Sequence, residues 1–128
     1  MNLLVDTHAV IWFITEDTKL PKEIRQVIES MDNTCFVSLA TYWELAIKNS
    51  LGRLDLGKPL VELFSIIEDS GFELLPIDIN HVLTSATLPF HHHDPFDRII
   101  IAQSLVEDIH IVTKDQKFQL YSTALIWK

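Results

Sequence analysis

The stretch Leu3-Leu4-Val5-Asp6 indicates the fold of this chain, because it has the pattern of a short buried strand that ends in an acidic residue. The last strong apolar run, Ile109-His110-Ile111-Val112, is likewise followed closely by Asp115. Strand-like runs alternate with helical segments throughout, which is typical of a parallel sheet covered by helices. Ligands bind such sheets beyond the carboxyl ends of the strands, so we expect Asp6 and Asp115 to meet there.

Two further acidic residues are expected at the same edge of the sheet. Glu44 lies in a helix that follows a strand over 34–37, and Asp97 lies in the first turn of a helix over 95–107. Carboxylates that face one point repel one another unless a cation lies between them. Hard divalent cations prefer such oxygen ligands. The sequence therefore indicates a metal site formed by Asp6, Glu44, Asp97 and Asp115.

Each of these acidic residues also has a purely structural interpretation. Asp6 could cap the helix that begins near Ala9, and Asp97 could complete a capping-box-like pair with Asp94. We assign Asp94 mainly to capping, because the following Pro95 is favoured at the first position of a helix. Glu44 is flanked by bulky apolar residues and, taken alone, is more typical of a solvent-facing position.

Other polar residues are candidates for supporting roles. Ser38 is a plausible N-cap for the helix that carries Glu44. Thr113 could hydrogen-bond a neighbouring carboxylate, and Arg98 or Lys114 could contact a substrate phosphate. The run His91-His92-His93 is not typical of a zinc site, because consecutive loop histidines cannot all face one ion. We expect it to form a solvated loop near the site.

Composition limits the classes of protein that fit. With 128 residues, 48% of them hydrophobic, the chain is expected to form one domain over 1–128. The single cysteine, Cys35, allows no internal disulfide, and no apolar run reaches the length of a membrane span. We therefore expect a soluble, cytoplasmic protein. The net charge of −8 argues against a broad basic surface, but it is compatible with a metal-dependent nucleic-acid enzyme.

The expected elements define a three-layer α/β/α sandwich. Apolar periodicity and turn residues predict strands over 2–6, 34–37, 73–77, 109–112 and 124–127. They predict helices over 9–15, 21–31, 38–51, 60–70, 79–88, 95–107 and 115–119. The helix over 9–15 is apolar enough to be buried or to form an interface. Trp12, Trp43 and Trp127 are expected in the core or in a dimer interface.

Four motifs, in this order and spacing, resemble the PIN-domain family and, within it, the VapC-type toxins of prokaryotic toxin–antitoxin pairs. The motifs are Leu3-Leu4-Val5-Asp6-Thr7-His8, Ser38 with Trp43-Glu44-Leu45, His93-Asp94-Pro95-Phe96-Asp97-Arg98 before Ile101-Ala102-Gln103, and Val112-Thr113-Lys114-Asp115 with Phe118. The resemblance implies a five-stranded parallel sheet in the order 3-2-1-4-5. It also implies metal-binding carboxylates at the positions of Asp6, Glu44, Asp97 and Asp115.

For function, the resemblance implies an endoribonuclease that depends on Mg²⁺ or Mn²⁺ and leaves 5′-phosphate and 3′-hydroxyl ends. It further implies a homodimer and a small antitoxin protein that blocks the acidic groove. Asp6 and Asp97 are the expected direct ligands, Asp115 and Glu44 would bind a second ion or its waters, and Thr113 would orient a ligand.

Three other functions fit parts of the pattern. A receiver-like signalling module also gathers aspartates around Mg²⁺, but Asp6 is followed by Thr7-His8 instead of a second acid. A catalytically silent PIN scaffold would bind only a protein partner, although it would have no need of clustered repelling charges. A DNA nuclease would use the same metal chemistry.

Overall fold

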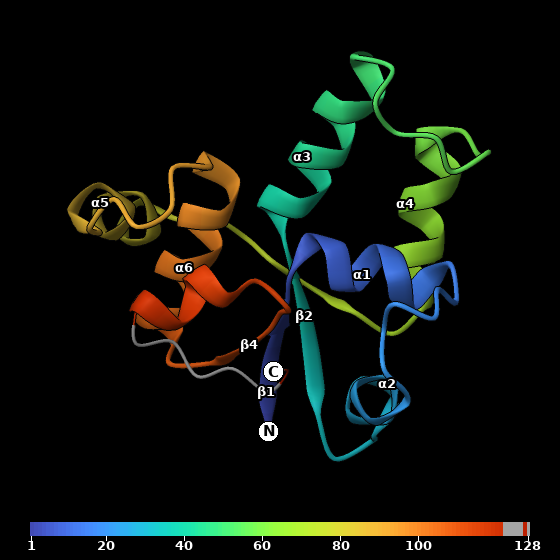
Figure 1. Cartoon of the computed structure of the whole chain (residues 1–128), viewed down its shortest axis with the longest axis horizontal. Coiled ribbons are helices and arrows are strands. Elements are labelled where there is room, and N and C mark those ends of the chain that lie inside the picture. The colour runs from blue at the N-terminus through green and yellow to red at the C-terminus, as the bar shows by residue number, and fades with distance from the viewer. Residues whose placement is uncertain (122–126, 128) are drawn as a thin grey trace.

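The computed structural model describes residues 1–121 and residue 127, which form a parallel sheet with helices on both faces (Figure 1). The strands are β1 (Asn2–Val5), β2 (Thr34–Ser38), β3 (Glu73–Leu75) and β4 (His110–Val112). All neighbouring strands pair in parallel, in the order β3-β2-β1-β4. The sheet of the described residues thus has four strands and not the five expected. The segment predicted as the fifth, 124–127, lies outside the described residues apart from Trp127.

The helices begin and end within two residues of the predicted positions. They are α1 (Thr7–Ile14), α2 (Lys22–Glu29), α3 (Leu39–Ser50), α4 (Leu60–Asp69), α5 (Ile79–Thr87), α6 (Pro95–Glu107) and the 3-10 helix η1 (Gln116–Tyr121). Side-chain caps fix where the helices near the sheet edge begin. Asp6 accepts from the Ala9 N–H at the start of α1, and Ser38 accepts from the Ala40 N–H at the start of α3.

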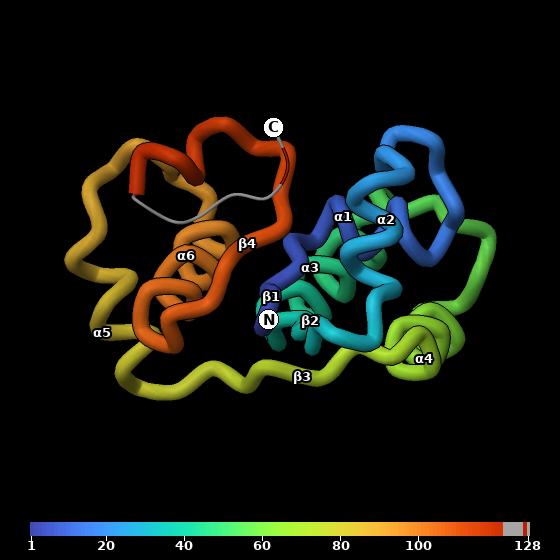
Figure 2. Tube along the Cα trace, turned by 90° about the horizontal axis from the view of Figure 1, so that it is seen from below, coloured from blue at the N-terminus to red at the C-terminus, as the bar shows by residue number. Residues whose placement is uncertain are grey.

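The core lies on both faces of the sheet because successive residues of a strand point to opposite sides. Leu3 and Val5 belong to an apolar cluster that includes residues of α1, α2 and α4. Leu4, between them, belongs to a second cluster that includes Ile100 and Ile101 of α6. Figure 2 shows α5 and α6 on one side of the strands and α1, α2 and α4 on the other. The three-layer arrangement expected from the sequence is therefore present.

The tryptophans differ from one another in burial. Trp127 is buried and lies edge-on to the half-buried Trp12, with ring centroids 5.6 Å apart. Trp43 is 60% exposed, so a place in the core is wrong for this residue. It stands edge-on to Phe96 at 5.3 Å and leaves one flank open to solvent.

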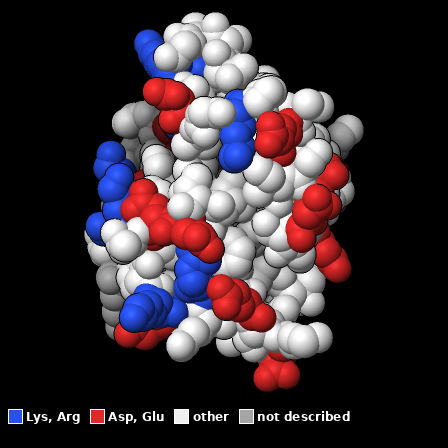
Figure 3. All heavy atoms as spheres, turned by 90° about the vertical axis from the view of Figure 1, so that its right-hand side faces the viewer, with Lys and Arg blue, Asp and Glu red and all other residues white. Residues whose placement is uncertain are grey.

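The surface carries both signs of charge. Figure 3 shows acidic and basic side chains interspersed on the face that lies to the right in Figure 1, without a continuous basic field. Within the described residues, no helix combines the length and the apolar character needed to cross a membrane.

Candidate metal centre and the family of the chain

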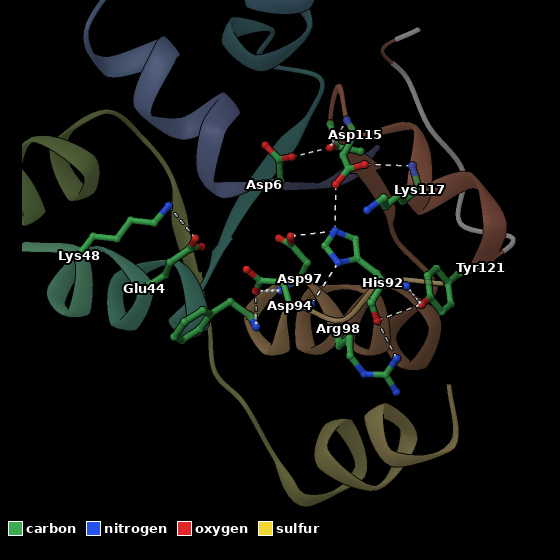
Figure 4. Close-up of polar contacts among 12 residues, drawn as sticks. Asp6, Glu44, Lys48, His92, Asp94, Asp97, Arg98, Asp115, Lys117 and Tyr121 are labelled. Carbon is green, nitrogen blue, oxygen red and sulfur yellow. Dashed lines mark hydrogen bonds and ion pairs between the residues drawn. The ribbon is translucent and has the colours of Figure 1, made fainter. Parts of the chain in front are cut away.

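Four acidic side chains converge at the carboxyl edge of the sheet (Figure 4). Asp6 follows β1 directly, and Asp115 follows β4 after two intervening residues. Glu44 projects from α3, which begins where β2 ends, and Asp97 lies in the first turn of α6. The residues that the sequence placed at this edge thus come together from four separate elements.

Asp6 and Asp115 are held on either side of Thr113. Both oxygens of Asp6 are used: Oδ1 accepts from the Ala9 N–H at 2.8 Å, and Oδ2 accepts from the Thr113 hydroxyl. The same hydroxyl oxygen accepts from the backbone N–H of Asp115 at 3.0 Å. Burial raises the pKa of Asp6 above its ordinary value, and the hydrogen bonds from Thr113 and Ala9 oppose this rise. Thr113 therefore orients one carboxylate and the backbone that carries another.

The carboxyl group of Asp97 has a strongly raised pKa. Burial first, and then the negative charges of Asp94, Glu44, Asp6 and Asp115, raise its pKa to about 8. In the absence of a cation, the site therefore holds Asp97 largely protonated at neutral pH. A divalent cation among these carboxylates would remove both causes of the shift, because it supplies positive charge and direct ligation.

Glu44 is buried, so the solvent-facing position that its neighbours suggested is wrong. Its Oε2 lies 2.9 Å from the ammonium of Lys48, one turn along α3. Its Oε1 is inaccessible to solvent and has no hydrogen-bond partner among residues 1–121 and 127. Buried carboxylate oxygens without a partner are rare and costly, and a bound cation is one of the few explanations. This oxygen is direct structural support for a cation site.

Lys48 is expected to stabilise the metal-free protein by partly compensating the charge of Glu44. Replacing Lys48 with methionine should lower the free energy of unfolding by about 1–3 kcal/mol, because a buried carboxylate loses its ion pair. Urea denaturation in the presence of a chelator measures the effect. The matched control is Lys58→Met, which removes the more exposed, 3.8 Å pair with Glu62 at the same spacing and should cost under about 1 kcal/mol. Equal losses in the two variants would contradict this role.

His92 joins the acidic cluster, which the sequence did not predict. The histidine loop is not uniformly solvated: His91 and His93 are exposed, whereas His92 is buried. The His92 Nε2 atom lies 3.0 Å from Oδ2 of Asp97 and 2.9 Å from Oδ2 of Asp115. No local pattern distinguishes the middle histidine, and only its distance of two residues from Asp94 connects it with the site.

Arg98 does not face the cluster, contrary to the phosphate contact expected of it. Its guanidinium is turned away from the carboxylates (Figure 4) and donates to four backbone carbonyls. These belong to Ser85, Leu88, Pro89 and His92, at 2.7, 3.0, 3.0 and 3.1 Å respectively. The side chain is buried and serves the loop between α5 and α6. Lys114, in contrast, lines an open hollow beside Asp6 and Asp115.

Asp94 is a cap and not a member of the converging set. Its Oδ1 accepts from the backbone N–H groups of Phe96 and Asp97, at 2.8 and 3.2 Å. This cap fixes the first turn of α6 and therefore the position of Asp97. Its negative charge also contributes to the raised pKa of Asp97.

The donor set fits a hard divalent cation. Asp6, Glu44, Asp97 and Asp115 offer only carboxylate oxygens, the ligands that Mg²⁺ and Mn²⁺ prefer. The partnerless Oε1 of Glu44 and the raised pKa of Asp97 are both features that a bound cation would relieve. We conclude that the residues present can hold such an ion.

Comparison with known proteins agrees with this geometry. Ribonuclease VapC22 of Mycobacterium tuberculosis (strain ATCC 25618 / H37Rv) is 26% identical over 119 residues, which are 92% of this chain and 90% of that protein. The fold matches that of VapBC2 from Rickettsia felis, solved bound to a DNA fragment from its promoter, with a TM-score of 0.73 and 16% identity over 98% of this chain and 97% of that one.

A second solved structure gives the same result. VapBC-1 from nontypeable Haemophilus influenzae matches with a TM-score of 0.68 and 21% identity, over 100% of this chain and 97% of the other. The PIN domain model matches residues 3–123, which include all four converging carboxylates. This chain therefore belongs to the PIN domain family.

Proposed function

We propose that this protein is an endoribonuclease dependent on Mg²⁺ or Mn²⁺ and the toxin of a type II toxin–antitoxin pair. The observation that carries the proposal is the convergence of Asp6, Glu44, Asp97 and Asp115 at the sheet edge of a PIN domain, with one buried Glu44 oxygen left without a partner. The likeness to Ribonuclease VapC22 supports RNA as the substrate.

We propose a separate role for each residue of the site. Asp6 and Asp97 are the proposed direct ligands, and Asp115 and Glu44 complete the oxygen set. When bound, a divalent cation lowers the pKa of a coordinated water and stabilises the charge that develops on the scissile phosphate. Thr113 keeps Asp6 in place through its hydroxyl, and burial of Asp6 and Glu44 limits competing solvent.

An open hollow beside the carboxylates has the size and lining for part of an RNA strand. Its volume is about 480 Å³, and its walls are Asp6, His8, Trp12, Lys114, Asp115 and Gln116. The aromatic rings of His8 and Trp12 lie 5.8 Å apart and offer flat surfaces on which a base can stack. Lys114 supplies positive charge at this wall for a phosphate.

Removing the Lys114 charge is expected to weaken RNA binding without changing the chemical step. Lys114→Ala should raise KM and leave kcat unchanged, because a phosphate contact contributes to ground state and transition state alike. The slope of log affinity against log salt for a single-stranded RNA should fall by about 0.7. Fluorescence anisotropy at several salt concentrations measures the slope. Lys22→Ala, on helix α2 and outside the lining of the hollow, is the control and should leave it unchanged.

We also propose a homodimer and a small antitoxin partner. Structural neighbours include VapBC proteins and a toxin–antitoxin complex from Klebsiella pneumoniae. An apolar hollow of about 340 Å³ next to Glu44 and Asp97 would accept apolar side chains of such a partner; it is lined by Ala40, Trp43, Ile47, Ile77, Pro95, Phe96 and Ile99. Light scattering tests the dimer. Co-expression with candidate small antitoxin proteins tests the partner, which should co-purify and suppress cleavage.

The decisive experiment compares cleavage of tRNA, rRNA and single-stranded DNA by the wild-type protein and Asp97→Asn, purified identically, with Mg²⁺, Mn²⁺ or a chelator. We expect RNA cleavage that requires metal and is lost in the variant. Equal activity in both preparations would mean a contaminating nuclease or a role for Asp97 limited to the helix. Cleavage of DNA alone would mean that the protein is a DNA nuclease. No cleavage by folded protein would favour the silent scaffold.

A further inference from the structure

The imidazole of His92 lies between Asp97 and Asp115, two of the proposed metal ligands. Its Nε2 atom and one oxygen each of Asp97 and Asp115 all lie within 4.8 Å of one another. The imidazole thus bridges a helix, α6, and the segment after β4 (Figure 4). Two opposite roles fit these distances: a nitrogen ligand of the metal, or a hydrogen-bond donor that holds the carboxylates.

The other ring nitrogen distinguishes these roles. The backbone N–H of Asp94 donates to Nδ1 of His92 at 3.3 Å, so Nδ1 presents its lone pair and the ring proton resides on Nε2. A histidine that ligates through Nε2 needs the opposite tautomer, and it almost always donates its Nδ1–H to an acceptor. Here Nδ1 meets a donor, the Nε2–H donates to Oδ2 of Asp115, and Oδ2 of Asp97 lies 3.0 Å from the same nitrogen.

The backbone of His92 is fixed from two sides. Its N–H donates to the Tyr121 hydroxyl at 2.6 Å, and its carbonyl accepts from the Arg98 guanidinium at 3.1 Å. The Tyr121 hydroxyl in turn donates to the carbonyl of Pro89 at 2.7 Å. Phe118 of η1 stands edge-on to the imidazole, with ring centroids 5.8 Å apart. The ring is therefore held in place by residues that are not themselves proposed ligands.

From this geometry we infer that His92 is a positioning residue and not a metal ligand. Its imidazole forms a clamp, in which Nε2–H donates to Oδ2 of Asp115 and the same nitrogen lies 3.0 Å from Oδ2 of Asp97. Asp115 is also held at Oδ1 by the Lys117 N–H at 2.9 Å. In Asp97, Oδ1 receives no hydrogen bond from a described residue, so the clamp leaves this oxygen for the cation. The inference rests on the proposed metal site and explains how two of its ligands stay aligned before metal binds.

The test measures metal binding directly and needs no RNA. Mg²⁺ and Mn²⁺ are titrated calorimetrically into the metal-free full-length protein, His92→Ala, His92→Gln and His93→Gln. We expect His92→Ala to weaken both metals by a similar factor, about 10–100-fold, as loss of an outer hydrogen bond to a ligand does. His92→Gln should restore most of the affinity, because its amide N–H can reach the same oxygens. His93→Gln, in the exposed neighbour, should bind like the wild type.

Two other results would overturn the clamp. A loss much larger for Mn²⁺ than for Mg²⁺ would identify a nitrogen ligand, since the softer donor favours the later metal. Tighter binding in His92→Ala would mean that the imidazole obstructs the site. The tautomer is read independently from ¹⁵N-histidine NMR spectra of the wild-type protein, which should show Nε2–H both without metal and with Mg²⁺. A wild-type protein that binds neither metal would instead refute the metal site itself, and the NMR spectrum would still test the hydrogen bond.

Discussion

The Asp97→Asn variant is expected to lose metal-dependent RNA cleavage and yet to be more stable than the wild-type protein at pH 8 without metal. Cleavage should fall at least about a thousandfold, equivalent to about 4 kcal/mol of transition-state stabilisation, because a proposed direct ligand loses its charge. Stability should rise because the asparagine cannot ionise in a buried group of carboxylates. Opposite changes in activity and stability are typical of residues kept for function.

The pH dependence of stability provides the sharper measurement. The pKa of Asp97 is about 8 in the folded protein and near 3.8 for an ordinary aspartate, so between these values the folded state holds a proton that the unfolded state has released. The free energy of unfolding of the metal-free wild type should therefore fall as the pH rises from about 4 to about 8. In Asp97→Asn this contribution to the pH dependence of the free energy of unfolding is absent.

Urea denaturation from pH 5 to 9 in a chelator, followed by circular dichroism, measures the free energy of unfolding of the wild type, Asp97→Asn and a control variant. Asp69→Asn removes an exposed acid at the end of α4 and serves as the control; it should follow the wild-type slope. Addition of Mg²⁺ should stabilise the wild type and leave Asp97→Asn nearly unchanged. A variant that cleaves RNA at the wild-type rate would show that Asp97 serves α6 and not the chemistry.

The sequence located those parts of the site that depend on local patterns. Asp6 and Asp115 could be placed because each follows an apolar run, and parallel strands bring their carboxyl ends to one edge. Asp97 could be placed because Pro95 fixes the start of a helix. For Glu44 the neighbouring residues gave a wrong expectation, because burial of a helical residue depends on tertiary packing such as that of α3 against α6, which the local sequence does not show.

His92 and Arg98 could not be assigned correctly because their roles depend on the path of one loop. The segment between α5 and α6 folds so that the carbonyls of Leu88, Pro89 and His92 all face the same guanidinium. No period or motif in the sequence encodes that path, and an arginine next to an aspartate suggests a phosphate contact equally well.

Replacing Arg98 is expected to be the most destabilising single change in this region. Arg98→Ala removes charged hydrogen bonds to four carbonyls and the contact with Phe90, whose ring centre lies 4.4 Å from the guanidinium carbon. The free energy of unfolding should fall by at least about 3 kcal/mol, because charged hydrogen bonds are strong and the buried carbonyls lose their donors. Urea denaturation in a chelator measures it, with Lys114→Ala as the control that leaves stability unchanged.

Arg98→Lys separates a structural role from a phosphate contact. Lysine keeps the charge, but its single ammonium cannot match the planar fork that reaches carbonyls of Ser85, Leu88, Pro89 and His92 together. We therefore expect Arg98→Lys to recover less than half of the lost stability. It should also weaken Mg²⁺ binding, since the His92 carbonyl loses its anchor. A fully stable Arg98→Ala protein with a reduced salt slope for RNA binding would instead place the guanidinium on phosphate and refute the structural role.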